Sequence, residues 1–250
     1  MAPKKSADDD PAAIAKRSAD LLWGGADADR PARGPKPRIS LGAIVEAGIR
    51  IADADGLDAV SMQRVAAEFG FTTMSLYRYV PGKNELIALM VDTAIGSAPD
   101  LGADGWRAAL RNWAIATWDV FSRHPWFLEA AFGSMMGPNQ LGWLEAAVAA
   151  VAPSGLSGPD LMDAVLVVNG HVRSMAPFHI AARTEQKPAA LPNDEWDSAI
   201  IGLITGNSER FPALTAAIRD GAFGPDDESQ GFEFGLERIL DGIDAYLNAR

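Results

Sequence analysis

Apolar side chains recur at three- and four-residue steps over most of this chain, and this periodicity restricts the possible folds more than any other feature. After Ser40, a residue able to cap a helix, Leu41, Ile44, Val45 and Ile51 follow the period of an α-helix. No segment alternates apolar and polar residues in the way that a half-buried strand does. The periodicity therefore predicts an all-α protein.

Glycine and proline divide the periodic segments into separate helices. Asp55-Gly56 ends the first helix, Gly70 separates two short helices, and Pro81-Gly82 precedes a fourth. In the N-terminal part we expect helices over residues 40–54, 61–69, 72–80 and 83–95. In the C-terminal part we expect helices over residues 106–123, 139–152, 160–182, 196–205, 213–220 and 232–247.

The stretch Ser61–Lys83 combines two of these short helices with a glycine turn between them. Val65 on the first helix, and Leu76 and Val80 on the second, are predicted to face inward. A second helix that keeps its outer side free can lie in the major groove of DNA, with its N-terminal residues on base edges. The pattern predicts a helix-turn-helix that binds double-stranded DNA.

The outer side of this second helix carries groups suited to a DNA duplex. Thr73 can hydrogen-bond to base edges, and its methyl group or Met74 can contact a thymine methyl. Lys83 opens the next helix, whose N-terminal N–H groups and dipole already favour a phosphate. Hydroxyl groups able to reach phosphate oxygens are present on Ser75, Tyr77 and Tyr79.

On these residues the segment 39–92 resembles the DNA-binding region of the tetracycline-repressor (TetR) family of regulators. The matching features are Ile44–Ala54 ending in Asp55-Gly56, then Ser61…Val65-Ala66, Gly70-Phe71-Thr72, Leu76-Tyr77, Tyr79-Val80 and Lys83-Asn84-Glu85-Leu86. The resemblance implies base contacts from Gln63, Thr73 and Met74. It places Ser61, Ser75, Tyr77, Tyr79 and Lys83 near phosphates. Arg78 could contact a phosphate or pair with an acid. The predicted DNA-binding residues are Ser61, Gln63, Thr72, Thr73, Met74, Ser75, Tyr77, Arg78, Tyr79 and Lys83.

One position departs from the family pattern. Gln63 stands where some family members carry an arginine that reads guanine. Glutamine pairs best with adenine in the major groove, so adenine is the base expected there.

The remainder of the chain resembles, more loosely, the C-terminal ligand domain of the tetracycline-repressor branch. Its landmarks are Trp106…Leu110, His124-Pro125-Trp126, Gly137-Pro138-Asn139 and Glu209-Arg210-Phe211-Pro212. The resemblance implies a helical bundle with a ligand cavity, and a dimer interface built from helix 160–182 and the last helix. The predicted dimerisation residues are Val165, Val168, Val172, Leu236, Ile239 and Ile243.

Aromatic and methionine side chains gather in the first half of this C-terminal part. They could be simple core, or they could line a pocket for a bulky, flat, apolar effector with a few polar anchors. The predicted ligand-binding residues are Trp113, Trp118, Phe127, Met135, Trp143, Asn169, His171, Met175 and His179. We expect no metal or other cofactor, because His171 and His179 are eight residues apart and do not stack as an i,i+4 metal pair does.

Residues 1–38 read as a flexible N-terminal extension. Within it, Pro11–Trp23 could be a frayed segment or a short helix that docks on the body. The run Arg30–Arg38 could be a solvated linker or an arm that places Arg33 or Arg38 against DNA. The predicted organisation is this extension (1–38), a helix-turn-helix domain (39–95), and a ligand-binding and dimerisation domain (96–250).

Composition and charge fit this organisation. The chain has no cysteine, no apolar run of the roughly 20 residues that a membrane span needs, and no apolar segment after Lys4-Lys5 that would form a secretory signal, so we expect a cytoplasmic protein. The net charge of −11 is uneven. Residues 1–95 hold 12 Lys/Arg against 13 Asp/Glu, whereas residues 96–250 hold 10 against 20. The near-neutral N-terminal part is the end expected to approach DNA.

Together these features predict a repressor that binds a palindromic operator as a homodimer and is released by a small apolar or aromatic effector. The alternative is a helical small-molecule-binding protein or enzyme without DNA binding. No Gly-rich phosphate loop, G-x-S-x-G elbow or H-E-x-x-H run supports an enzyme.

Overall fold

The computed structural model describes residues 10–24, 39–102, 104–131, 134–183, 194–222 and 228–249. Within these ranges every regular element is a helix and no strand occurs, so the predicted all-α fold is confirmed. The contacts group the chain into two compact units, residues 1–169 and 170–250, and the division falls inside one long helix. No helix in the described ranges has the length and apolarity required to cross a membrane.

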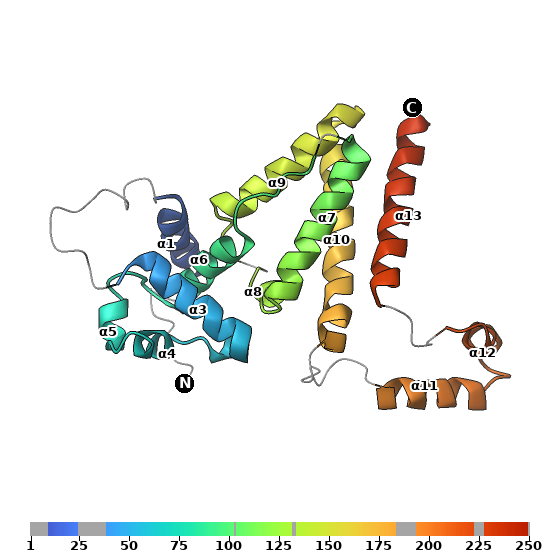
Figure 1. Cartoon of the computed structure of the whole chain (residues 1–250), viewed down its shortest axis with the longest axis horizontal. Coiled ribbons are helices and arrows are strands. Elements are labelled where there is room, and N and C mark those ends of the chain that lie inside the picture. The colour runs from blue at the N-terminus through green and yellow to red at the C-terminus, as the bar shows by residue number, and fades with distance from the viewer. Residues whose placement is uncertain are drawn as a thin grey trace. The chain divides into compact units, whose positions relative to one another are not determined.

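The first unit begins with α1 (Pro11–Trp23), which packs on α6 (Lys83–Ile95) (Figure 1). Asp10 caps α1 by accepting a hydrogen bond from the N–H of Ala12, and Pro11 occupies the first helical position. Of the two alternatives for this segment, the structure shows the docked helix. The Arg30–Arg38 run lies outside the described residues.

The helix-turn-helix region contains α3 (Leu41–Asp55), the 3-10 turn η2 (Leu57–Ala59), α4 (Met62–Ala67) and α5 (Thr73–Leu76), of which α4 and α5 form the motif itself. Ser40 and Ser61 cap α3 and α4, each accepting a hydrogen bond from the N–H three residues on. Gly70 turns the chain between α4 and α5 at a φ of 67°, a conformation that favours glycine. Both short helices are shorter than the sequence pattern predicts.

Next in the chain, α6 packs closely against α3. Gly48 permits this approach, because a Cβ there would lie 2.7 Å from the sulfur of Met90. Leu86, Leu89 and Met90 of α6 are buried. Thr93 is exposed, and the acids Glu85 and Asp92 are buried.

The rest of the first unit is built from α7 (Trp106–Arg123), the short α8 (Phe127–Ala130), α9 (Pro138–Val151), the 3-10 turn η3 (Ala152–Ser154) and the first part of α10 (Gly158–Arg183). Helix α9 packs on both α7 and α6. The rings of Phe121, Trp126 and Phe127 form an aromatic cluster where α7 ends and α8 begins, with centroids 5.8–6.2 Å apart. This cluster is part of the core.

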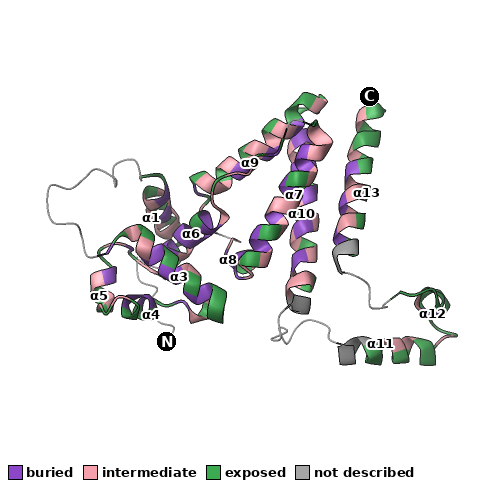
Figure 2. Ribbon diagram, in the orientation of Figure 1, coloured by how far each residue is buried: buried purple, intermediate pink, exposed green. Residues whose placement is uncertain are grey.

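The second unit holds the remainder of α10 together with α11 (Asp194–Gly206), α12 (Pro212–Arg219) and α13 (Glu228–Asn248). His171 of α10 stacks on Phe232 of α13, with ring centroids 5.6 Å apart, and its Nε2 lies 2.9 Å from the carbonyl oxygen of Phe232. Gly235 leaves room for the His171 ring. Figure 2 shows buried positions along α10, whereas α12 is mostly exposed.

Candidate nucleic-acid interface and effector site

The candidate DNA-binding surface is an exposed face on α4, α5 and the turn that follows α5. Leu76 and Val80 hold this segment to the core and are at most 1% exposed. On the opposite side, Met74 is 74% exposed and Tyr77 is 44% exposed. The alternation of anchored and free side chains follows from helical geometry, because residues three or four apart share a face.

The other candidate DNA-binding residues surround this face. Thr72, Arg78, Gln63 and Ser61 are exposed, and Thr73, Ser75, Tyr79 and Lys83 are half-buried. The hydroxyls of Thr72 and Ser75 lie 3.2 Å apart, so one donates to the other. The Ser61 hydroxyl oxygen accepts the N–H of Arg64, which leaves its proton free to be donated outward.

Arg64 is a cation beside this face that does not need DNA as a partner. Its guanidinium forms an ion pair with Asp55 at the end of α3. Among the cations near the recognition segment, Arg78 has greater exposure than Lys83, which is the first residue of α6. The two lie on either side of the turn at Pro81-Gly82.

A polar cluster of Asp53, His124 and Trp126 joins the helix-turn-helix region to the helices that follow it. Asp53 of α3 uses one carboxylate oxygen, Oδ1, for two contacts: the Nε1–H of Trp126 donates to it at 2.6 Å, and His124 Nδ1 lies 2.8 Å away. Trp126 is buried and its ring lies edge-on to that of His124. This cluster therefore connects α3 to the segment between α7 and α8.

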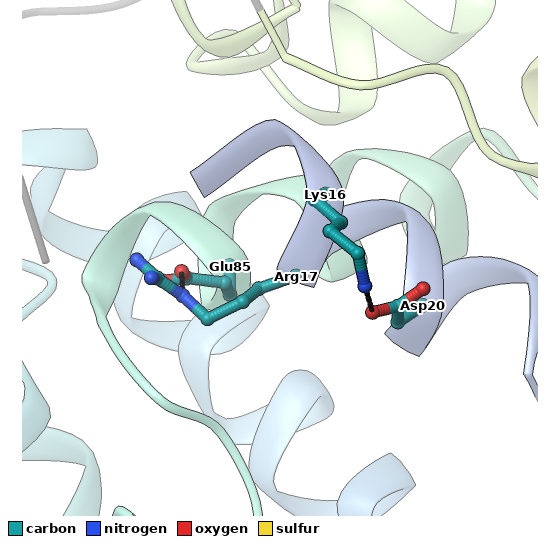
Figure 3. A network of polar contacts seen from close by, with 4 residues as sticks. All are labelled: Lys16, Arg17, Asp20 and Glu85. Atoms are coloured by element: carbon teal, nitrogen blue, oxygen red, sulfur yellow. Dashed lines mark hydrogen bonds and ion pairs between the residues drawn. The ribbon is translucent and has the colours of Figure 1, made fainter. Parts of the chain in front are cut away.

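Helix α6 carries two buried carboxylates that bind different neighbours. Glu85 forms an ion pair with Arg17 of α1, in which Nε of Arg17 donates to Oε1 of Glu85 at 2.6 Å (Figure 3). Only 2% of the Glu85 side chain is exposed. A buried charge of this kind requires a partner, because its desolvation is costly when it is unpaired. In the same view Lys16 and Asp20 form an exposed pair within α1.

Asp92, two turns further along α6, caps the start of α9. Its Oδ1 accepts the N–H of Gln140 at 3.0 Å, and its backbone carbonyl accepts a bond from the side-chain amide of Asn139. Gly137 packs against the carboxylate so closely that a Cβ there would clash with it. Burial raises the pKa of Asp92, and the hydrogen bonds from Gln140 and Asn139 partly offset the increase.

The candidate effector residues divide between core positions and half-buried positions. Trp113 and Trp143 are about 5% exposed, and both indole N–H groups have partners, the carbonyl oxygens of Trp143 and Gly96 respectively. Phe127 belongs to the aromatic cluster. Half-buried candidates are Trp118 and Met135 in the first unit, Asn169 at its end, and His171, Met175 and His179 in the second.

The candidate dimerisation residues are mostly inside the subunit. Val165, Val168, Val172 and Leu236 are at most 1% exposed, so their side chains have almost no surface left for a partner. Ile239 and Ile243 are half-buried. Large apolar side chains that do remain exposed on the same two helices are Leu166, Val167, Phe178, Phe234 and Tyr246.

Sequence reasoning missed the polar groups that join the helices: Asp53, Glu85, Asp92 and Arg17. One signal was available for two of them. Glu85 and Asp92 are seven residues apart, and Glu85 directly precedes Leu86 while Asp92 directly follows Val91, so both interrupt a predominantly apolar helix. An acid at a register that should be buried indicates a buried partner, although the pattern does not say which one.

Comparison with known proteins agrees with this geometry. Residues 44–90 match the model for bacterial regulatory proteins of the tetR family, and residues 98–247 match that for tetracyclin repressor-like C-terminal domains. The HTH-type transcriptional repressor DrrR1 of Streptomyces coeruleorubidus is 39% identical over 240 residues, which cover 94% of this chain and 87% of that protein.

Solved structures show the same fold. Apo ActR from Streptomyces coelicolor superposes with a TM-score of 0.73 at 22% identity, over 86% of this chain and 99% of that one. ActR in complex with actinorhodin gives a TM-score of 0.71 at 23% identity, over 86% and 99%. A helical binding protein or enzyme without DNA binding is not favoured by these matches. With a family match to each of its two parts and a close repressor relative, the chain belongs to the TetR family of transcriptional regulators.

Proposed function

We propose that this chain is a ligand-responsive transcriptional repressor that binds a palindromic operator as a homodimer. The observation that carries the DNA-binding part is the exposed face of α5 and its following turn, where Met74 and Tyr77 point outward while Leu76 and Val80 anchor the segment. A segment presented in this way fits the major groove of B-form DNA. Repression follows when the bound dimer covers a promoter.

We assign base contacts to Gln63, Thr73 and Met74. Thr73 and Met74 occupy the first two positions of α5, the end that approaches base edges, and Gln63 is exposed on the neighbouring α4. Phosphate contacts are assigned to the hydroxyls and cations around them. This set comprises Ser61, Thr72, Ser75, Tyr77, Arg78, Tyr79 and Lys83.

The effector is proposed to be a small apolar or aromatic molecule. ActR, which shares the fold, has been crystallised with actinorhodin and with (S)-DNPA, and this supports a small-molecule effector here. The aromatic and methionine-rich composition of the body supports an apolar one. No catalytic step is required for this function.

We propose that the effector favours a dimer whose two recognition segments are wrongly spaced for DNA. Half-sites one helical turn apart require a separation of ~34–36 Å. To reverse a 99:1 population, the effector must bind the released form ~10⁴-fold more tightly, or ~5.5 kcal/mol. Helix α6 is the proposed lever, because its two buried carboxylates connect it to α1 and to α9.

The dimer is proposed to form through α10 and α13. The exposed large apolar side chains on these helices support this choice, because aromatic residues are enriched at protein interfaces. Half-buried Ile239 and Ile243 are retained as edge contacts. The buried residues Val165, Val168, Val172 and Leu236 are proposed to hold the interface helices in place from inside the protomer.

A gel-shift titration with DNA from the chain's own promoter tests the proposal. Lys83→Ala should weaken binding to all sequences and reduce the slope of log affinity against log salt by about one, because one phosphate contact is lost. Lys16→Ala is the matched control, since Lys16 is an exposed lysine of α1 paired with Asp20. Equal slopes for wild type and Lys83→Ala would remove Lys83 from the phosphate set.

Base reading has a separate test. Thr73→Ala should relax the preference at one base pair in each half-site, by ~1–3 kcal/mol against the other bases. Binding to a library of operator variants measures this directly. Uniform weakening over all variants would show that Thr73 only positions the helix, and no binding to any promoter DNA would overturn the proposed function itself.

A further inference from the structure

The second half of α1 is held against the rest of the first unit by several contacts. Ser18 and Leu22 are buried, and Arg17 reaches the buried Glu85 of α6. At the end of the helix, the indole N–H of Trp23 donates to the carbonyl oxygen of Met136 at 3.2 Å. The helix therefore bridges α6 and the segment that leads into α9.

A cleft of about 830 Å³ lies beside α1, a size suited to a drug-sized molecule. One wall is α1, with Ile14 and Ala15, and another is α6, with Ile87 and Ala88. Ser134, Met135 and Met136, which precede α9, contribute the third wall. The site predicted for the effector from the sequence shares only Met135 with this cleft.

The polar groups of the cleft restrict the chemistry of its occupant. The hydroxyl oxygen of Ser134, which lines the cleft, is buried and has no hydrogen-bond partner in the part of the chain that the structure describes. A buried hydroxyl without a partner costs free energy, which a ligand acceptor or donor would recover. Glu129 is the only charged residue among the described residues that line the cleft, so an anion is disfavoured.

We propose that this cleft is a binding site for an uncharged or cationic, largely apolar small molecule with one polar group directed to Ser134. A ligand bound there contacts both α1 and α6, so it changes how α1 packs against α6, the helix proposed to connect the DNA-binding region to the rest of the chain. Binding in the cleft is independent of the proposed function. The effect on DNA affinity rests on that function and deepens it by giving an effector a defined site.

Binding is tested with the neutral fluorescent probe N-phenyl-1-naphthylamine, titrated into the full-length chain. Ala15→Trp fills the cleft from α1, and we expect it to raise the probe's dissociation constant at least about tenfold, because each 1.4 kcal/mol of lost contact gives a factor of ten. Ala12→Trp is the matched control: the same substitution, one turn away on the exposed side of α1 and outside the cleft. It should leave the constant within about twofold.

A second variant guards against simple loss of α1 docking. Met135→Trp fills the cleft from the opposite wall without altering α1 and should also weaken probe binding. The proposal is overturned if wild type does not bind the probe, if both filling variants bind it as wild type does, or if Ala12→Trp loses binding to the same extent.

The regulatory part is read on promoter DNA. A saturating concentration of probe should change the DNA affinity of wild type and Ala12→Trp at least about fivefold, the lower end of ordinary allosteric coupling, and leave that of Ala15→Trp unchanged. Probe binding with no change in DNA affinity would overturn the regulatory part alone. If none of the proteins binds promoter DNA, the proposed function fails, while the probe titration still decides whether the cleft is a binding site.

Discussion

Single polar residues hold the helix-turn-helix to the body, and Asp53 is the clearest case. One of its oxygens accepts the indole N–H of Trp126 and lies next to His124 Nδ1. Hydrogen bonds to a charged acceptor are stronger than neutral ones, and a buried indole N–H that loses its acceptor bears a desolvation cost. Asp53 thus joins α3 directly to the segment between α7 and α8.

Asp53→Ala should lower the free energy of unfolding by about 1–3 kcal/mol, because Trp126 loses its hydrogen-bond acceptor. Urea unfolding followed by tryptophan fluorescence measures this change. Glu46→Ala, at an exposed position on the same helix, is the control and should stay within about 0.5 kcal/mol of wild type.

A double-mutant cycle tests the contact between Asp53 and His124. The losses of unfolding free energy caused by Asp53→Ala and His124→Ala should not add in the double variant. Strict additivity would mean that Asp53 and His124 do not interact.

The limits of sequence reasoning differ from residue to residue. The outward exposure of Met74 and Tyr77 could be predicted, because helical period alone decides which side of α5 faces Leu76. The role of Asp53 could not, because an acid on the polar side of a helix looks the same whether it faces water or a tryptophan 73 residues away. Long-range polar partners leave no periodic signal.

At the scale of elements, helices with clear stop signals could be predicted closely. The predicted range 106–123 coincides with α7, because Gly105 and His124-Pro125 bound it. The four-residue α8 is too short to show a period and could not be found in this way. The sequence does not decide whether α1 forms a docked helix, because its stability depends on packing against α6, which the local sequence does not reveal.

Helix α6 makes a prediction that depends on pH. Because burial raises the pKa of Asp92 above its ordinary value of 3.8, the folded chain holds this proton more tightly than the unfolded chain. The contribution of Asp92 to stability is therefore greatest at acid pH and falls as pH rises from about 3.8 through the raised pKa. Asp92→Asn removes this titration while keeping an oxygen that can accept the N–H of Gln140.

The measurement is urea unfolding at several pH values from about pH 4 upward, because the contribution of the raised pKa falls as the pH increases. The stability of Asp92→Asn should rise relative to wild type across this range. Asp58→Asn, at an exposed aspartate in η2, should track wild type. A wild-type to Asp92→Asn difference that is constant with pH would show that Asp92 has the same pKa in the folded and unfolded chains.

At the scale of the whole molecule, the proposed repressor needs a two-fold dimer, because a palindromic operator is read by two identical segments. The proposed dimer uses α10 and α13, but burial within one chain decides which side chains can reach a partner. Val165 is buried while its neighbour Leu166 is 53% exposed. An interface on α10 therefore uses the register of Leu166, one residue away from the register that the apolar pattern predicts.

Leu166→Glu should therefore convert the dimer to monomers with little change in melting temperature, since the new charge is solvated in the monomer but buried in the dimer. Val165→Glu, one position away, should instead destabilise the fold itself, because its charge is placed in the core. Sedimentation equilibrium and thermal unfolding of the two variants separate these outcomes. The Leu166→Glu monomer should also lose its preference for the full operator over a single half-site. If Leu166→Glu sediments as a dimer, the interface does not include this face of α10. Other helices must then hold together the two protomers and their DNA-binding surfaces.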